Sequence, residues 1–466
     1  MGASVRAYIT LGNDAVSHRS AAPLATSDDA PSITCRFDSP QQQIIGFGAA
    51  LTEASAHVFN QMPSNVQEEF LTRCFAKPSL GGSGYTLCRT HLQSSDFALG
   101  NYAYVARPLP WRSALSTFSI ERDRRLLLPF IARCQQCAQS MSIIAAPWSP
   151  PAHMKTNQTM NYGGRLMRPF YKSWANVLSH AVRAWRAEGI ALDRLTVQNE
   201  PLARQTWDSC LYTARQEATF ASRYLRPALD ACGCSDVKLL AWDHNKNKMV
   251  ERVNDLERAL ERPSLLERLL GDVPQHFDDT FAGTAFHWYA GDHFDNVRAV
   301  HQRHPACELI HSEGCAAFSN GSGLTRAKDA EHYAHDIIGD LNAGTNGYVD
   351  WNILLDDQGG PNHVGNYCDA PLMYDRATQK LLVNRSFEYL AHFSRSIRPG
   401  ARIVPCTAPT RLQAVAAVNE DGTRTLTVLN KTGKPRAFAI EDTRPQGQCA
   451  RKAYDLPAHS ICTLMW

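Results

Sequence analysis

The sequence of 466 residues has no long apolar run and no large excess of charge of either sign. Its nearest apolar stretch, LLLPFIA at 126–132, contains a proline and falls well short of the roughly 18 residues that a membrane-spanning helix needs. The 48 Lys and Arg residues nearly balance the 45 Asp and Glu residues, which gives a formal net charge of +3 without long charged runs. These features predict no membrane span and no electrostatic footprint for nucleic acid.

Targeting signals and cysteine frameworks are also missing. The N-terminal segment MGASVRAYITLGNDAVSHRS lacks the basic stretch and apolar block of a secretory signal, so cytoplasmic residence is the default expectation. The 14 cysteines are too sparse for a disulfide scaffold, and we expect them to be reduced and mostly buried. The pairs Cys134/Cys137 and Cys232/Cys234 have no matching pair that would complete a tetrahedral site, so no structural zinc is expected.

What the sequence does contain is an alternation of short apolar runs with longer amphipathic segments, which is typical of strands joined by crossover helices. The helical segments include 121–140, 168–188, 213–230 and 327–342, with apolar residues three and four positions apart. The expected strands are 43–48, 85–90, 142–146, 194–198, 237–242, 283–289, 308–312 and 347–352.

Eight such units predict an α/β fold of the (β/α)8 TIM-barrel type. The alternative is an open α/β sheet, which the absence of a glycine-rich dinucleotide fingerprint after the first strand makes the weaker interpretation. Short alternating runs flank the barrel at 4–11, 413–418, 426–430, 436–440 and 460–466, separated by turn signals such as Asp421-Gly422. We therefore predict a catalytic barrel over 41–397 and a small side β-sandwich built from both chain ends, 1–40 and 398–466.

Two glutamates stand where predicted barrel strands end. The fourth strand runs directly into Asn199, Glu200 and Pro201, and the seventh runs into Glu313 and a glycine. Working residues of such barrels lie at the carboxyl ends of the strands. Paired carboxylates are what glycosidic bond cleavage requires, one as an acid and the other as a nucleophile or as a base toward water.

Aromatic side chains recur at the same strand ends, namely Trp148, Trp207, Trp288, Tyr289 and Trp351. Their rings offer flat faces to the C–H faces of sugars. For any one of these residues alone, a core tryptophan or a loop salt bridge is the simpler interpretation. The recurrence of glutamates or aromatic residues at five strand ends favours a carbohydrate site.

Seven segments carry a resemblance to glycoside hydrolase family 30, which includes the glucosylceramidases and bacterial relatives. They occur in the family's order between about residues 44 and 400: GFGAALTEASA at 46–56, YTLCRTHLQSSDF at 85–97, IIAAPWSPPAHMKTN at 143–157, LTVQNEP at 195–201, AFHWY at 285–289, HSEGC at 311–315 and DWNILLDDQGGPN at 350–362. The resemblance implies a barrel with a side sandwich and a mechanism that retains anomeric configuration through a covalent glycosyl-enzyme.

The resemblance also implies roles for single residues. Glu200 matches the acid/base and Glu313 the nucleophile. Asn199 matches the residue that binds the sugar 2-hydroxyl, and Arg89 and Tyr289 match the residues beside the nucleophile. The other expected substrate-binding residues are Asp96, Trp148, Trp207, His287, Trp351 and Asn366.

Retention predicts carboxyl groups about 5 Å apart, against roughly 6.5 Å or more for an inverting pair. We expect contacts with Arg89 and Tyr289 to lower the pKa of Glu313. Burial and a negative neighbour are expected to raise the pKa of Glu200. The raised value would disappear once the glycosyl-enzyme neutralises Glu313.

The sequence departs from the glucosylceramidases at the expected pocket mouth. His153 and His363 stand where those enzymes have tryptophans, so the entrance is predicted to be more polar. No metal role is expected for His153, His287, His311 or His363. Cys315, next to the nucleophile segment, is expected to be structural.

The preferred hypothesis is a retaining exo-β-glycosidase acting on a terminal β-glucoside, whether a glucosylceramide-like lipid, an alkyl or aryl glucoside, or an oligosaccharide. The alternatives are a β-xylosidase, an endo-xylanase or a β-1,6-glucanase of the same family, and a catalytically silent carbohydrate-binding barrel. A metal-dependent hydrolase is disfavoured because no HExxH motif is present. We expect no cofactor, no metal and no partner beyond the carbohydrate or glycolipid, and the oligomeric state is left open.

Overall fold

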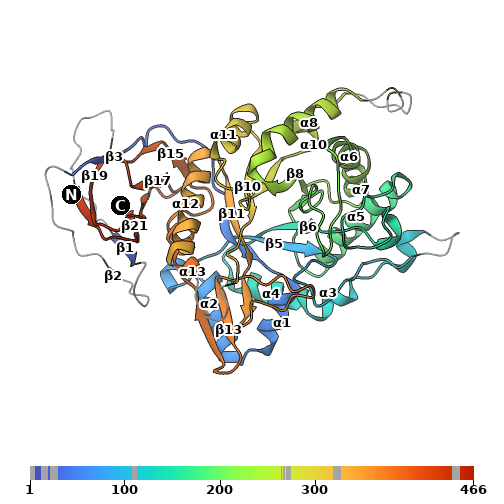
Figure 1. The fold of residues 1–466 in the computed structure, drawn as a ribbon, viewed down its shortest axis with the longest axis horizontal. Helices are drawn as coiled ribbons and strands as arrows, with labels where there is room; N and C mark the ends of the chain where they lie inside the picture. Colours follow the sequence, from blue (N-terminus) through green and yellow to red (C-terminus); the bar gives the residue numbers. More distant parts are fainter. Residues whose placement is uncertain are drawn as a thin grey trace.

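Eight parallel strands close into a barrel in the order β4-β5-β6-β7-β8-β9-β10-β11, with β11 pairing back onto β4 (Figure 1). The computed structural model describes residues 6–11, 19–20, 30–107, 113–263, 265, 268, 274–318, 327–442 and 452–466. The closed order of the eight strands confirms the predicted barrel. Its strands are β4 Gly46–Ala50, β5 Leu87–Leu92, β6 Ser142–Pro147, β7 Arg194–Thr196, β8 Lys238–Asn245, β9 Gly283–His287, β10 Glu308–Glu313 and β11 Gly347–Asn352.

Helices surround the barrel and connect its strands (Figure 1). The helix predicted over 121–140 is broken at Leu126, because a continuous helix would press the ring of Pro129 against the carbonyl group of Arg125. Restarting the helix puts this proline in a first turn, where it is tolerated. The described α-helices are α1 Glu53–Gln61, α2 Ser64–Phe75, α3 Glu121–Arg125, α4 Leu127–Cys137, α5 Tyr171–Ala187, α6 Ala214–Phe220, α7 Arg226–Ala231, α8 Met249–Glu261, α10 Phe277–Thr280, α11 Phe294–Arg303, α12 Ala327–Ala343 and α13 Arg385–Ser396.

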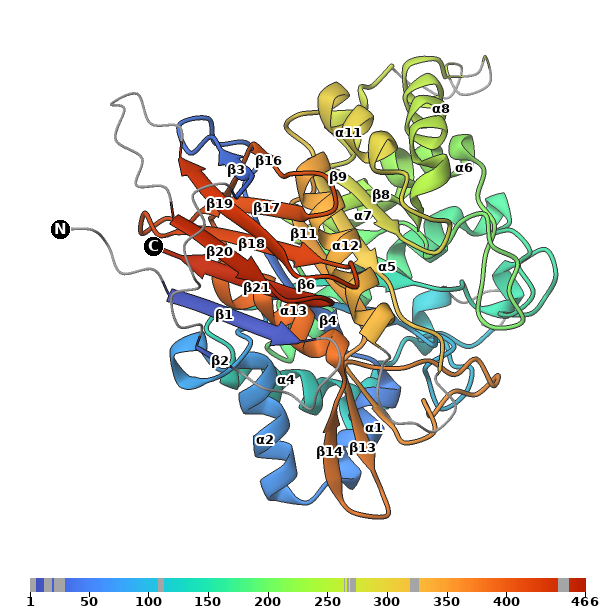
Figure 2. The same cartoon turned by 60° about the vertical axis from the view of Figure 1, so that its left-hand side comes forward.

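A sandwich of two sheets stands beside the barrel and takes strands from both chain ends, as predicted (Figures 1 and 2). The N-terminal strand β1 pairs antiparallel with the C-terminal strand β21. One sheet has the order β15-β17-β18-β21-β1-β2 and the other β16-β3-β19-β20. Their bounds are β1 Arg6–Leu11, β2 Arg19–Ser20, β3 Ser32–Cys35, β15 Arg402–Val404, β16 Cys406–Thr407, β17 Gln413–Val418, β18 Arg424–Asn430, β19 Arg436–Asp442, β20 Lys452–Leu456 and β21 Ser460–Met465.

Several strands lie outside the sequence prediction. The sandwich strands β2, β3, β15, β16 and β20 are only two to five residues long. A three-stranded sheet that the sequence did not predict, β12 Leu354–Asp356, β13 Leu372–Asp375 and β14 Lys380–Val383, follows the last barrel strand and projects from the barrel (Figure 2). Segments of three or four residues are too short for a period of two to be recognised.

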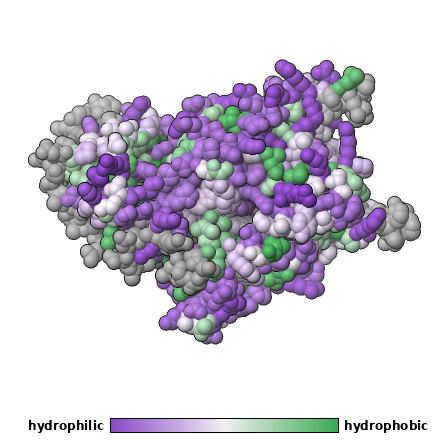
Figure 3. All heavy atoms as spheres, in the orientation of Figure 1, coloured by the Kyte–Doolittle hydropathy of each residue, from purple (hydrophilic) through white to green (hydrophobic). Residues whose placement is uncertain are grey.

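One hydrophobic cluster joins the sandwich to the barrel. Side chains of β17, β18 and β21, among them Val415, Leu429 and Ile461, belong to the same buried cluster as the barrel helices. The helices α12 and α13 lie between the two parts (Figures 1 and 2). The face seen in Figure 3 is largely hydrophilic, with small separate hydrophobic patches. Among the described residues, no helix is long and apolar enough to cross a membrane.

The carboxyl ends of three barrel strands are irregular. The pairing register shifts between Trp242 and His244 in β8, between His311 and Glu313 in β10, and between Asp350 and Asn352 in β11. A bulge of this kind inserts an extra residue and redirects the neighbouring side chains. The redirected side chains lie at the edge of the barrel where the site is formed.

Candidate active site

A cavity of about 390 Å³ opens at the carboxyl ends of the barrel strands. Most of the residues predicted from the sequence line it: Asp96, Trp148, Asn199, Glu200, Trp207, Tyr289, Glu313, Trp351 and Asn366. The other two, Arg89 and His287, are fully buried and lie directly behind the lining carboxylates. The structure thus brings these eleven residues together. Trp288, the remaining strand-end aromatic residue, is not part of the cavity lining and packs against His332 and Tyr333.

Glu313, the last residue of β10, is held by two donors. One guanidinium nitrogen of Arg89 donates to its Oε2 atom, and the hydroxyl of Tyr289 donates to its Oε1 atom at 3.0 Å. Arg89 also donates to Asn199 at 2.7 Å and to Asp243 at 2.8 Å. Burial acts to lower the pKa of Arg89, but the charges of Asp243 and Glu313 outweigh it and raise that pKa. A permanent cation therefore fixes the Glu313 carboxylate.

Two tryptophans support this arginine. The rings of Trp148 and Trp351 stack with centroids 5.3 Å apart, and the guanidinium carbon of Arg89 lies 4.7 Å and 5.4 Å from their centroids. Both indoles line the cavity but are only 2% and 3% exposed. They therefore orient the cation beneath the nucleophile as well as offering edges to a ligand.

Asp243 is a site residue that the sequence reasoning missed. It lies at the bulge of β8 with a φ of 54°, and its Oδ1 atom accepts a hydrogen bond from Ser312 at 2.6 Å and lies 3.1 Å from Nε2 of His287. Burial acts to raise the pKa of Asp243, but Arg89 and His287 hold it below its ordinary value. The predicted strand ended at Trp242, so applying the strand-end argument to the next two residues would have identified Asp243 and His244.

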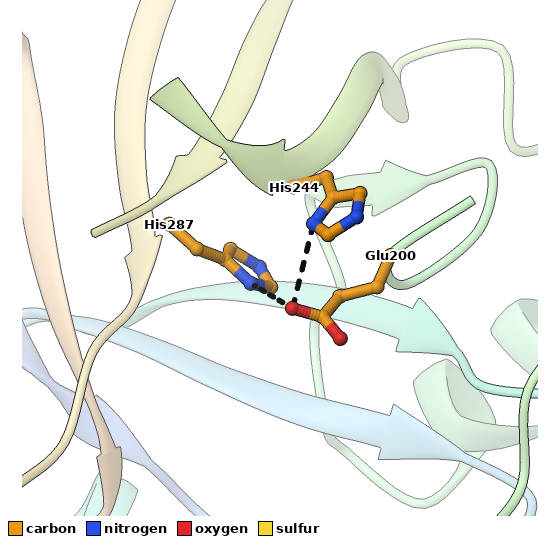
Figure 4. Close-up of side chains that lie close together, drawn as sticks. All are labelled: Glu200, His244 and His287. Carbon is orange, nitrogen blue, oxygen red and sulfur yellow. Dashed lines mark hydrogen bonds and ion pairs between the residues drawn. The ribbon is translucent and has the colours of Figure 1, made fainter. Parts of the chain in front are cut away.

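Glu200 lies just beyond β7 in a left-handed conformation with a φ of 45°, and its amide donates to the carbonyl of Asp243 at 2.9 Å. Its Oε1 atom is 3.2 Å from Nδ1 of His287 and 3.5 Å from Nδ1 of His244 (Figure 4). The expectation of a raised pKa is wrong for this state of the protein. Burial does act to raise the pKa of Glu200, but contacts with the two imidazoles outweigh burial and lower it.

His287 joins the two carboxylates. Its Nδ1 atom is 3.2 Å from Oε1 of Glu200 and 3.9 Å from Oε1 of Glu313, so those two oxygens lie no farther apart than the sum of these distances. Burial acts to lower the pKa of His287, but the charge of Glu313 and the contacts with Asp243 and Glu200 raise it to about 9. At neutral pH the imidazole is therefore protonated and bridges the carboxylates.

Asp96 lies at another wall of the cavity and accepts a hydrogen bond from Asn366 at 3.1 Å. Burial and the charge of Glu313 raise the pKa of Asp96 to about 7, despite that hydrogen bond. Neither His153 nor His363 is part of the cavity lining, and His363 instead lies 3.5 Å from Asp208. The polar lining that the sequence did not predict comes from other residues, chiefly Gln205, His244, Asn245 and Tyr367.

Three clusters of side chains among the described residues have the spacing of metal ligands. They are Glu200, His244 and His287 in the cavity, the more exposed Asp278, His304 and Cys307, and the buried His311, Asp336 and Asp340. Two histidines for which no metal role was expected, His287 and His311, belong to these clusters. Lys246 donates to both aspartates of the buried cluster and so already places a positive charge there.

Comparisons with known proteins agree with this architecture. The family models "Glycosyl hydrolase family 30 TIM-barrel domain" and "Glycosyl hydrolase family 30 beta sandwich domain" match residues 44–397 and 400–464. The lysosomal acid glucosylceramidase of Mus musculus is 30% identical over 93% of this chain and 83% of its own length. The endo-1,6-beta-D-glucanase of Neurospora crassa is 26% identical over 89% and 83%. The crystal structure of SrfJ from Salmonella typhimurium is 36% identical, with a TM-score of 0.87 over 99% of both chains. Because both family models match in order along nearly the whole length, the chain belongs to glycosyl hydrolase family 30 and is a glycoside hydrolase.

Proposed function

We propose that the protein is a retaining exo-β-glucosidase that removes a terminal β-linked glucose through a covalent glycosyl-enzyme. The observation that carries this proposal is the approach of two carboxylates to one imidazole nitrogen, Glu200 at 3.2 Å and Glu313 at 3.9 Å. These contacts allow the separation of about 5–5.5 Å that retaining enzymes need, and their sum of 7.1 Å excludes most of the roughly 6.5–9.5 Å range in which inverting enzymes admit a water.

The surroundings of the two carboxylates favour different roles. Glu313 is bound by Arg89 and Tyr289, which hold its carboxylate in a fixed position at the cavity, as a nucleophile requires. Glu200 contacts two histidines, which exchange protons more readily than an arginine does. Glu313 attacks the anomeric carbon and forms an ester while the bond to the leaving oxygen breaks, and Glu200 protonates that oxygen.

Because the pKa of Glu200 is lowered in the free protein, Glu200 needs a source for the proton that it gives to the leaving oxygen. The pair of Glu200 and His287 holds one proton at neutral pH, and in the free protein it lies on the imidazole. We infer that it crosses the 3.2 Å contact from Nδ1 to Oε1 as the reaction proceeds. After the ester has neutralised Glu313, the Glu200 carboxylate accepts a proton from water, and water attacks the ester.

An exo mode and a glucose unit are favoured by polar groups in the cavity lining. The buried Asp96 and the exposed Asn366 present a carboxylate and an amide to the cavity, where hydroxyl groups of a terminal sugar find hydrogen-bond partners. The lining also contains Gln205, His244 and Asn245, which suit a polar leaving group such as a second sugar at least as well as a lipid.

A β-1,6-glucanase is the second candidate. The similarity to an endo-1,6-beta-D-glucanase and the polar wall around Glu200 both favour it. Assaying aryl β-glucoside and β-xyloside beside β-1,6-glucan fragments and glucosylceramide distinguishes the candidates. Release of glucose alone supports exo action, whereas early release of longer fragments supports the glucanase.

The acid/base role has its own test. Glu200→Gln is expected to slow hydrolysis of poor leaving groups far more than good ones, because only the former need protonation. Azide should restore part of the activity toward a good leaving group by attacking the ester in place of water. An equal loss on both substrate types, without rescue by azide, contradicts the assignment.

A further inference from the structure

Three possible ligand atoms converge on the Glu200 side of the cavity. Glu200 follows β7, and His244 and His287 lie in the neighbouring strands β8 and β9. Nδ1 of His287 is 3.2 Å and Nδ1 of His244 is 3.5 Å from Oε1 of Glu200 (Figure 4). One ligand atom from each side chain lies within 4.8 Å of the others. Two imidazole nitrogens and a carboxylate oxygen therefore face a common point.

These separations suit a zinc ion. With zinc–nitrogen and zinc–oxygen bonds of about 2.0–2.2 Å, the ligand atoms of a tetrahedral ion lie about 3.3 Å apart. Two histidines and one glutamate are also a ligand set that leaves a fourth position open. Here the open position would face the cavity, because Glu200 and His244 both line it.

The surroundings fix both imidazoles for this purpose. Nε2 of His287 lies 3.1 Å from Oδ1 of Asp243, the arrangement of carboxylate, histidine and metal that orients a ring and raises its basicity. Ser312 donates to the same aspartate oxygen and holds it in place. Nδ1 of His244 is buried and lies 3.5 Å from Oε1 of Glu200, which is itself a proposed ligand.

The local charge also suits a cation. Asp243, Glu200 and Glu313 surround His287, while Arg89 supplies one permanent positive charge. Three carboxylates against one guanidinium leave negative charge around the position where a metal ion would sit, which favours a cation there.

We propose that Zn²⁺ binds Glu200, His244 and His287 and reversibly inhibits the enzyme. The ion replaces the proton on His287, and that proton passes to solvent. A metal-bound Glu200 neither protonates a leaving oxygen nor accepts a proton from water. Inhibition rests on the proposed role of Glu200, whereas metal binding does not.

Binding is tested without turnover by titrating the intact protein with Co²⁺ and following the visible absorption of a tetrahedral centre. The titration uses the His304→Asn variant, because this substitution removes a ligand from the separate cluster of Asp278, His304 and Cys307. One equivalent of Co²⁺ should produce the bands, and Zn²⁺ or EDTA should abolish them. Introducing His244→Asn into the His304→Asn variant should weaken Co²⁺ binding at least tenfold. Absence of bands, or unchanged binding in that variant, overturns the site.

Inhibition is then measured as the ratio of aryl β-glucoside hydrolysis with and without Zn²⁺, within each variant. In the parent protein it should be competitive and reversed by EDTA. His244→Asn should lose at least tenfold in sensitivity, while His304→Asn should keep it.

Cys315→Ser separates this site from a thiol site, because Cys315 also lines the cavity. Retained inhibition in this variant supports the proposal, whereas lost inhibition assigns the metal to the thiol and contradicts it. If Co²⁺ binds as expected but Zn²⁺ does not inhibit, the metal site stands and the acid/base role of Glu200 fails.

Discussion

At the scale of single residues, Asp96 is a carboxyl group whose charge changes near neutral pH. Its pKa is raised to about 7 by burial and by the charge of Glu313. An ionised carboxylate accepts stronger hydrogen bonds from sugar hydroxyls than a protonated acid does. The affinity of the cavity for a sugar is therefore linked to the protonation of this group.

We expect a neutral competitive inhibitor such as glucose to bind progressively more weakly as the pH falls from about 8 to 6. Asp96→Asn should weaken binding about tenfold or more and flatten this pH dependence. Asp123→Asn is the matched control, because its pKa is also raised by burial, to about 6, but it contacts Tyr102, Tyr104 and Trp185 away from the cavity. Isothermal titration measures the affinities, and an unchanged profile in Asp96→Asn would contradict this role.

For some residues of the site, the sequence alone was enough to predict the position. Glu200, Glu313 and the aromatic residues follow apolar strands directly, so their position was visible in the order of residues. The lowered pKa of Glu200 was not predictable, because it depends on how His244 and His287 approach from two other strands. Partners that are distant in sequence leave no local pattern.

At the scale of elements, the bulge of β8 is supported by the helix behind it. Glu217 of α6 accepts a hydrogen bond from the amide of Trp242 at 2.8 Å and from Nε of Arg252 in α8 at 2.8 Å. Both charged side chains are buried. The pair thus ties two helices to the backbone that presents Asp243 and His244 to the cavity.

Glu217→Ala should lower the free energy of unfolding by about 3–5 kcal/mol, because it leaves Arg252 buried without its partner. The double variant Glu217→Leu with Arg252→Met should recover most of that stability but not the full kcat, because the amide of Trp242 stays unbound. Glu69→Ala, which breaks an exposed ion pair with Arg73, should cost less than about 1 kcal/mol. Urea unfolding and steady-state kinetics provide both readouts; full activity in the double variant would rule out a positioning role.

Elements differ in how well the sequence predicts them. The barrel strands were recognised because short apolar stretches alternate with amphipathic helices along the chain. The register shifts in β8, β10 and β11 were not, because they arise when neighbouring strands pair. The bulges, and with them Asp243, became visible only in the assembled sheet.

At the scale of the whole molecule, the sandwich is an extension of the barrel core. Leu429 and Ile461 are fully buried in the cluster that contains the barrel helices, while the sandwich also has an inner core of its own around Phe438 and Leu464. Separate unfolding of either part would expose this shared apolar surface. We therefore expect the two parts to unfold together.

Leu429→Ala should destabilise the whole protein by about 2–5 kcal/mol and shift a single thermal transition to lower temperature. Calorimetry and tryptophan fluorescence, which reports on the barrel, should move together. Leu464→Ala, in the inner core of the sandwich, is the matched comparison. Two resolved transitions in the Leu429→Ala variant would show that the parts fold independently.

The central claim, that Glu313 forms a covalent bond to the sugar while Glu200 serves as acid/base, is tested most directly by trapping. An activated 2-deoxy-2-fluoro-β-glucoside slows hydrolysis of the ester, so the intermediate accumulates and its position can be mapped by peptide mass spectrometry. The account predicts one sugar per chain, attached to Glu313, and none in Glu313→Gln. A label on any other residue, or release of product with inverted configuration, would contradict it.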